Sequence, residues 1–142
     1  MKQTHVCCSE KEMIELAAGI ARTLRGGEVF ALVGELGSGK TTFVKGLALG
    51  LKIPVTATSP TFNLVHRYTG GRLPLIHYDL FRLKKLAEIE ALDLETELQQ
   101  KNVIAIEWPQ IVKPILPADR TRWIEFQETR DLARTVVITN RS

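Results

Sequence analysis

The most constraining feature of this sequence is the octapeptide GELGSGKT at residues 34–41. It fits the pattern G-x-x-x-x-G-K-[S/T], which is typical of a loop that wraps around the phosphates of a nucleotide. The loop follows Glu28–Val33, a short apolar run that favours a buried strand, and overlaps the start of Lys40–Leu51, whose apolar residues recur at helical spacing. A strand, a glycine-rich loop and a helix in this order predict an α/β fold around a parallel sheet.

Each fixed residue of the loop has a chemical reason. Gly34, Gly37 and Gly39 let the backbone curl so that its N–H groups converge on the phosphates. The N-terminus of the following helix adds free N–H groups and the positive end of its dipole. Lys40 is expected to bring positive charge to the β- and γ-phosphates, and Thr41 to offer its hydroxyl to a bridging Mg²⁺. The segment therefore predicts a site for a magnesium–nucleotide complex.

The rest of the chain alternates between short strands and helical segments. A helix is expected after Ser9, where Glu12 completes a capping box, and it should end at Gly26-Gly27. The prediction is a single domain over residues 1–142, an α/β sandwich with a mostly parallel central sheet, added antiparallel hairpins and helices on both faces. Further strands are expected at Thr4–Cys8, Phe62–Tyr68, Leu73–Phe81, Val103–Ile106, Arg122–Phe126 and Thr135–Thr139, and one or two helices within Leu83–Gln100, broken near Leu92-Asp93.

Composition places the chain among ordinary globular proteins. Of its 142 residues, 44% are hydrophobic and 25% are charged, which argues against a disordered chain. The formal net charge of +3 does not by itself indicate nucleic-acid binding. Cys7 and Cys8 are adjacent, so we expect free thiols. No signal-peptide core and no apolar run of about 18 residues occurs, which predicts a cytoplasmic protein without a membrane segment.

Two carboxylates are candidates for the acidic partner that a magnesium–nucleotide site needs. Glu107 directly follows the buried strand Val103–Ile106, and ligands bind beyond the carboxyl ends of strands in open α/β sheets. Asp79 follows Leu75–Tyr78, part of a predicted strand, and would fit either a metal-bound water or the attacking water. Each carboxylate has a structural alternative, either as a cap on a strand end or as the partner of a surface arginine.

Nearby residues give weaker signals. Trp108 is as consistent with core packing as with stacking on a ligand. His77 alternates with Asp79 along a strand, and a structural histidine is the better interpretation. Thr58–Thr61 fits either a switch that senses the γ-phosphate or an ordinary turn.

Taken together, these motifs resemble the TsaE family, also called YjeE, the bacterial ATPases of tRNA threonylcarbamoyladenosine biosynthesis. The resemblance covers nearly the whole chain, although the residues after Pro109 carry no strong signature. Four segments carry it, in the family's order and spacing: GELGSGKTTF at 34–43, TSPTF at 58–62, HYDLFR at 77–82 and IEWP at 106–109.

The resemblance implies an ATPase, weak when alone, that acts with TsaB and TsaD in the modification of adenosine 37 of tRNA. TsaD would transfer the threonylcarbamoyl group, and ATP hydrolysis would sustain repeated cycles, while direct contact between this chain and tRNA stays open. By the same resemblance, Thr58–Phe62 corresponds to a switch region. The implied catalytic residues are Lys40, Asp79, Glu107 and Trp108; the implied metal ligands are Thr41 and Glu107; and the implied ATP-binding residues are Ser9, Gly37, Ser38, Gly39, Lys40, Thr41 and Thr42.

Three other functions stay open at the level of the sequence. A P-loop kinase usually closes a lid over its substrates and brings several arginines to the transferred phosphoryl group. No insertion of lid length is present, and the candidate arginines, Arg120, Arg122, Arg130 and Arg134, come late in the chain. A GTP-dependent switch usually carries an N/T-K-x-D element, which does not occur here, so ATP is favoured. The third alternative is a module in which nucleotide only stabilises the fold.

Overall fold

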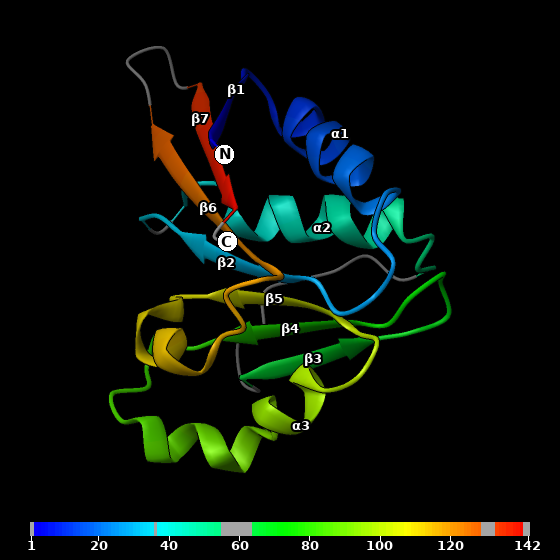
Figure 1. Ribbon diagram of the computed structural model, residues 1–142. Coiled ribbons are helices and arrows are strands. Elements are labelled where there is room, and N and C mark those ends of the chain that lie inside the picture. Colours follow the sequence, from blue (N-terminus) through cyan, green and yellow to red (C-terminus); the bar gives the residue numbers. More distant parts are fainter. Residues whose placement is uncertain (1, 36, 55–63, 129–132, 141–142) are drawn as a thin grey trace.

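The computed structural model describes residues 2–35, 37–54, 64–128 and 133–140. In this part the chain builds one seven-stranded sheet with helical segments on both faces (Figure 1). The strands are β1 (Lys2–Cys7), β2 (Val29–Val33), β3 (Val65–Tyr68), β4 (Leu75–Asp79), β5 (Val103–Glu107), β6 (Thr121–Glu128) and β7 (Arg134–Asn140). The helical segments are α1 (Glu10–Ala21), α2 (Lys40–Gly50), α3 (Leu94–Leu98) and the 3-10 helices η1 (Leu86–Leu92) and η2 (Pro109–Ile115).

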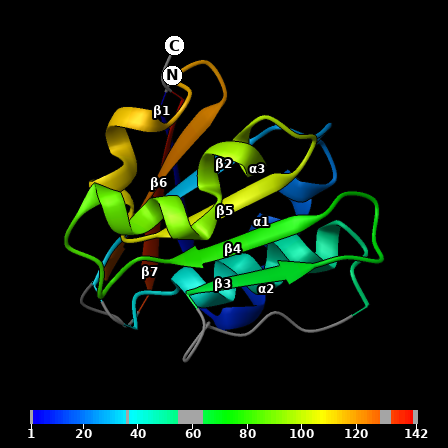
Figure 2. The same ribbon diagram turned by 90° about the horizontal axis from the view of Figure 1, so that it is seen from below.

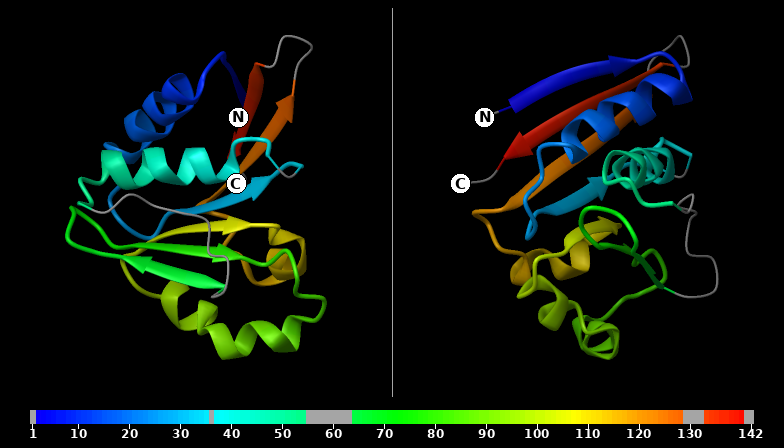
Figure 3. Two further views of the ribbon diagram at one scale, coloured as in Figure 1. Left: turned by 180° about the vertical axis from the view of Figure 1, so that it is seen from behind. Right: turned by 90° about the vertical axis from the view of Figure 1, so that its right-hand side faces the viewer.

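The sheet is mixed, with the order β1-β7-β6-β2-β5-β4-β3. The three central pairs, β6 with β2, β2 with β5 and β5 with β4, are parallel. The three outer pairs are antiparallel, so the sheet is parallel in its centre but not over most of its width. Both predicted hairpins are present as β3–β4 and β6–β7. β1 pairs with β7 and forms one edge of the sheet (Figure 3), a pairing that was not predicted.

The two faces of the sheet carry separate cores. Helices α1 and α2 cover one face and pack on side chains such as Phe30 and Ala105. The segments η1, α3 and η2 cover the other face and pack on side chains such as Val29 and Ile104, as the view from below shows (Figure 2). Because side chains alternate along a strand, the apolar run of β2 supplies both cores at once. None of the helices in the described ranges is long and apolar enough to cross a membrane.

Two local predictions are refined. The Ser9 hydroxyl accepts the backbone N–H of Glu12 at 3.1 Å, as in a capping box. The Glu12 carboxylate, however, reaches back to the N–H of Cys8 at 3.1 Å, one residue before the expected partner. The segment predicted as one or two helices within Leu83–Gln100 forms the 3-10 helix η1 and the short α-helix α3. It breaks at Asp93, whose φ of 54° lies in the left-handed region.

Gly46 lets α1 and α2 approach closely, which gives a stability prediction. A Cβ atom added at Gly46 would lie 2.6 Å from both the Ala17 Cβ and the carbonyl oxygen of Ile14. Since a backbone atom cannot rotate away, Gly46→Ala should force the helices apart and lower the free energy of unfolding by about 1–3 kcal/mol. Urea denaturation measures this change.

Gly19 supplies the matched control on the same helix pair. A Cβ atom added there would meet nothing within 4 Å. Gly19→Ala should therefore raise stability by up to about 1 kcal/mol through helix propensity alone. Equal effects of the two substitutions would show that close helix packing at Gly46 does not limit stability.

Candidate functional site

The parallel centre of the sheet brings the predicted site residues to one edge. Strands β2, β4 and β5 run in the same direction, so their carboxyl ends lie side by side. Asp79 and Glu107 are the last residues of β4 and β5 and are paired in register. Leu32 of β2 pairs with Glu107, and the glycine-rich loop begins two residues later at Gly34. Both carboxylates are therefore held at the mouth of the loop.

A cavity of about 390 Å³ lies at this edge, a size suited to a small-molecule ligand. Its walls combine polar groups from the loop, α2 and the strand ends with apolar groups from the N-terminal segment and from the residues that follow β4 and β5. The lining residues are Cys7, Ser9, Glu10, Met13, Gly37, Gly39, Lys40, Thr41, Thr42, Asp79, Phe81, Glu107, Trp108 and Arg134.

The N-terminus of α2 faces this cavity without a cap. Gly39 occupies the N-cap position with a φ of 108°, a conformation that favours glycine, and it provides no side-chain hydrogen bond. The first turn of the helix carries no acidic residue. Free N–H groups and the positive end of the helix dipole therefore attract an anion such as phosphate.

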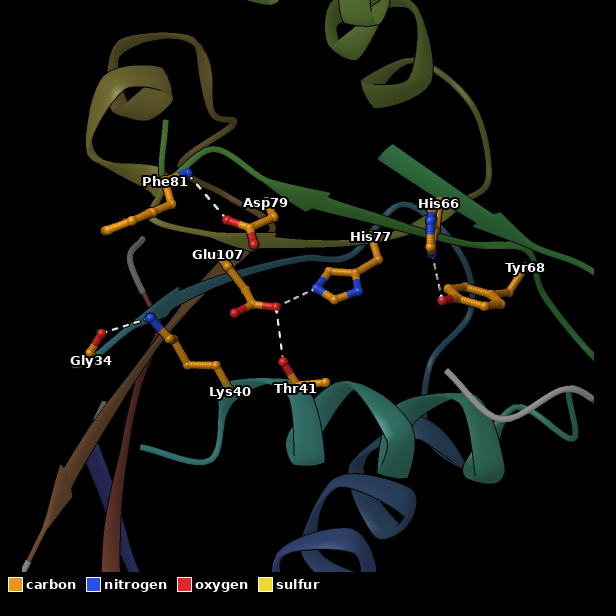
Figure 4. Close-up of polar contacts among 9 residues, drawn as sticks. All are labelled: Gly34, Lys40, Thr41, His66, Tyr68, His77, Asp79, Phe81 and Glu107. Atoms are coloured by element: carbon orange, nitrogen blue, oxygen red, sulfur yellow. Dashed lines mark hydrogen bonds and ion pairs between the residues drawn. The ribbon is translucent and has the colours of Figure 1, made fainter. Parts of the chain in front are cut away.

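Lys40 brings a positive charge to the start of α2. Its Nζ donates a hydrogen bond to the carbonyl oxygen of Gly34 at 2.7 Å (Figure 4), and it lies 3.8 Å from the centre of the Trp108 ring. Burial lowers the pKa of Lys40 below its usual value, while the carboxylates of Glu107 and Asp79 act in the opposite direction. The ammonium group therefore sits in partly dry surroundings, where its attraction to a phosphate is stronger than in water.

Glu107 is almost completely buried, at 4% exposure, and connects α2 to the sheet. Its Oε2 accepts a long hydrogen bond of 3.4 Å from the Thr41 hydroxyl and lies 2.6 Å from Nε2 of His77. Figure 4 shows both contacts meeting at this one oxygen, with the other oxygen directed away from His77. The neighbouring carboxylate of Asp79 accepts the N–H of Phe81 at 3.1 Å. Burial raises the pKa of Asp79, and the nearby charge of Glu107 raises it further.

The oxygen donors of this site suit Mg²⁺. Thr41 supplies a hydroxyl and Glu107 a carboxylate, which are hard ligands of the kind that this ion prefers. Within the described residues, no group of three or more His, Cys, Asp or Glu side chains gathers to hold a metal on its own. That finding is compatible with Mg²⁺ bound by one or two protein ligands together with phosphate oxygens and water.

Trp108 adopts a left-handed φ of 58°, which is unusual for a bulky residue. The residue lies immediately after β5, and its ring packs 4.8 Å from that of Phe81, centre to centre. This conformation helps to keep the indole at the cavity wall. Backbone strain of this kind is often found at ligand sites.

The structure places most of the predicted residues together. Ser9, Gly37, Gly39, Lys40, Thr41, Thr42, Asp79, Glu107 and Trp108 all line the cavity. Ser38 is not among the lining residues, and its buried Oγ has no hydrogen-bond partner in the part of the chain that the structure describes. The predicted switch at Thr58–Phe62 lies outside the described residues.

Sequence reasoning did not find the wall that β1 and β7 form. Arg134 pairs in register with Cys7, and both residues line the cavity. An Nη atom of Arg134 also donates to the carbonyl oxygen of Gly37 at 3.2 Å. No local sequence pattern indicates that Cys7 and Arg134 line the cavity, because their placement depends on pairing between the two ends of the chain. His77, interpreted from the sequence as structural, contacts a predicted site residue directly.

Comparison with known proteins shows the family to which this chain belongs. Residues 7–136 match the family described as "Threonylcarbamoyl adenosine biosynthesis protein TsaE". The chain belongs to the TsaE family. A TsaE protein of Borreliella burgdorferi is 43% identical over 120 residues, which cover 84% of this chain and 87% of the relative. The TsaE protein of Streptomyces coelicolor is 41% identical over 133 residues, which cover 89% of each chain. Both relatives are named tRNA threonylcarbamoyladenosine biosynthesis proteins.

A solved structure supports the α/β architecture of this TsaE family member. The crystal structure of YdiB from Bacillus subtilis superposes with a TM-score of 0.80 at 29% sequence identity. The match covers all of this chain and 87% of YdiB. The mixed sheet and its helices are therefore shared with an experimentally determined fold.

Proposed function

We propose that this chain binds Mg-ATP in the cavity at the carboxyl edge of the sheet and hydrolyses it to ADP and phosphate. The observation that carries the proposal is the convergence of the uncapped α2 N-terminus, Lys40 and Glu107 on one cavity. The first two groups favour a polyphosphate, and the carboxylate favours the cation that accompanies it. In this proposal the glycine-rich loop acts as a P-loop.

The individual roles follow from the positions of the side chains. The loop and Lys40 bind the phosphates and neutralise charge on the transferred group. Thr41 and Glu107 would hold Mg²⁺, which neutralises further charge on the phosphate oxygens when it is bound. Asp79 orients the attacking water, whose oxygen bonds to the γ-phosphorus as the bond to the ADP oxygen breaks. Trp108 helps to exclude other water, and Ser9 borders the adenosine end of the cavity.

The biological setting is proposed from the family. Relatives across several bacterial lineages are named tRNA threonylcarbamoyladenosine biosynthesis proteins. We place the ATPase of this chain in that modification, with TsaB and TsaD as partners and tRNA as the substrate of the complex. Hydrolysis by the isolated chain is expected to be slow and to increase when the partners are present.

A kinase is less well supported by the arginine positions. Arg120 donates to the carbonyl oxygens of Gly27 and Leu98, which fixes its guanidinium to backbone outside the cavity lining. Of the late arginines in the described ranges, Arg134 is the one that lines the cavity. Kinases that transfer a phosphoryl group to a small molecule usually bring several such cations to it.

The test is nucleotide binding followed by hydrolysis. Calorimetric titration should show that ATP and ADP bind more tightly than GTP and that Mg²⁺ strengthens ATP binding. Phosphate release should then rise when cognate TsaB, TsaD and tRNA are added. Preferential GTP binding would contradict the ATPase assignment, and transfer of phosphate to an added small molecule would favour the kinase. A rate of phosphate release that does not change when the partners are added would contradict the proposed role in tRNA modification.

A further inference from the structure

His77 is buried in a way that packing alone does not explain. It lies on β4 with 0% exposure, and its Nε2 is 2.6 Å from Oε2 of Glu107. Its other ring nitrogen, Nδ1, is also buried and has no hydrogen-bond partner in the ranges that the structure describes. A polar ring with one unpaired nitrogen in a core costs free energy that an apolar side chain would avoid. The contact with Glu107 is the feature that distinguishes this histidine.

The register of the sheet directs the ring toward Glu107. His77 pairs with Ala105 of the parallel neighbour β5, and Glu107 lies two residues further along on the same face. Ala105 has a small side chain, so the imidazole can extend along the sheet to the carboxylate. The same face is covered by α2, which brings Thr41 to the same carboxylate (Figure 4).

Both neighbours of Glu107 contact the same oxygen. The Thr41 hydroxyl lies 3.4 Å from Oε2, a weak contact, whereas the His77 contact at 2.6 Å is short. In the tautomer that carries its proton on Nε2, the ring donates to Oε2, and Nδ1 has no N–H that would need an acceptor. The carboxylate is thereby fixed through one oxygen, and Oε1 is directed away from His77 (Figure 4).

We propose that His77 is a positioning residue of the Mg-ATP site, which holds the Glu107 carboxylate by its Nε2–H so that the other oxygen faces the ligand. The inference rests on the proposed function, because that function assigns Glu107 to the cation. Partners that orient a metal ligand through a hydrogen bond are nearly as important as the ligand itself, and their loss typically weakens metal binding or activity about 10–100-fold. The imidazole acts through Glu107 and touches neither cation nor nucleotide.

Two substitutions of similar polarity test the role. The side-chain amide of His77→Gln can place an N–H near the position of Nε2, whereas the shorter amide of His77→Asn reaches only the position of Nδ1. We expect His77→Asn to raise the Mg²⁺ concentration for half-maximal binding of a fluorescent ATP analogue about tenfold, and His77→Gln to restore most of that loss. In EDTA, the wild type and both variants should bind the analogue equally well, because binding without Mg²⁺ does not use Glu107 as a metal ligand.

His66 provides the control for loss of a histidine from this part of the sheet. It lies on β3 as the register partner of His77, but its ring contacts the Tyr68 hydroxyl at 3.0 Å. His66→Asn should leave the Mg²⁺ requirement unchanged. In a Glu107→Gln background, His77→Asn should add less than about a twofold further change, because coupled residues are not additive.

The outcomes separate the positioning role from the proposed function. A wild-type protein that binds the analogue without any effect of Mg²⁺ would overturn the function and the inference together. A wild-type Mg²⁺ effect that persists unchanged in His77→Asn would overturn the inference alone. Equal Mg²⁺ requirements of the Asn and Gln variants would also overturn the inference, even if both variants unfold at a lower temperature than the wild type. If His77 only stabilised the fold, the Mg²⁺ requirement would not depend on whether the amide N–H lies at the position of Nε2 or of Nδ1.

Discussion

Replacement of Lys40 by methionine is expected to lower kcat for ATP hydrolysis at least about a hundredfold, the usual effect of removing one preorganised group that stabilises developing charge. Methionine keeps an unbranched side chain of similar length but carries no charge. The Lys40 ammonium is held 2.7 Å from the Gly34 carbonyl oxygen, at the start of the loop that would surround the phosphates. Its loss leaves the helix N-terminus and the backbone to bind them alone. Phosphate release in the presence of TsaB, TsaD and tRNA measures the effect.

The fold should survive this substitution, which separates a loss of function from a loss of structure. Burial lowers the pKa of Lys40 in the folded chain, so the charged form is less favoured there than in the unfolded chain. This penalty on stability is fully present below the folded pKa and disappears as pH rises past the unfolded pKa. Lys40→Met removes the penalty, and its unfolding midpoint at pH 7 should not fall below that of the wild type.

Lys40→Arg provides a second comparison for the same site. It keeps the charge but replaces a compact ammonium by a planar guanidinium, which does not fit the space between Gly34 and the Trp108 ring in the same way. Hydrolysis should therefore stay low in this variant as well. Wild-type hydrolysis by Lys40→Met would show that the lysine has no part in the reaction.

The centre of the fold could be predicted because its signals are local. The apolar run before Gly34 and the run that ends at Glu107 are short, continuous and bounded, as expected of strands buried on both faces. The glycine-rich loop and the helix after it follow from a pattern that has few structural alternatives. These elements alone place Lys40, Thr41 and Glu107 near one another, which is why the candidate site could be predicted before its geometry was known.

The outer parts of the site could not be predicted, because they depend on contacts between distant segments. β1 and β7 come from opposite ends of the chain, and the sequence of neither strand indicates which strand it will pair with. This pairing brings Cys7 and Arg134 to the cavity. The role of His77 depends equally on register, since Ala105 must lie beside it for the ring to approach Glu107. The alternation of His77 with Asp79 indicates which face of the sheet His77 occupies, but it does not indicate the contact with Glu107.

The second large effect is expected from Glu107→Gln, which preserves the shape of the side chain and removes its charge. Hydrolysis should fall about a hundredfold or more, and the Mg²⁺ concentration for half-maximal ATP binding should rise at least about tenfold. The physical reason is that a buried amide neutralises no cation charge, although it can still accept hydrogen bonds from Thr41 and His77. Magnesium titrations of ATP binding and of phosphate release measure the two effects separately.

Asp79→Asn is the matched comparison, because Asp79 ends the neighbouring strand in register with Glu107. If Asp79 orients the attacking water, its replacement should lower hydrolysis while the Mg²⁺ requirement for ATP binding stays at the wild-type value. If it belongs to the metal shell, both quantities should change together, as in Glu107→Gln. One oxygen of each carboxylate already has a polar partner, the N–H of Phe81 for Asp79 and Nε2 of His77 for Glu107, but Glu107 also has Thr41, the expected magnesium ligand, directly beside it. That asymmetry favours Glu107 for the cation and Asp79 for the water, and an unchanged Mg²⁺ requirement in Glu107→Gln would refute it.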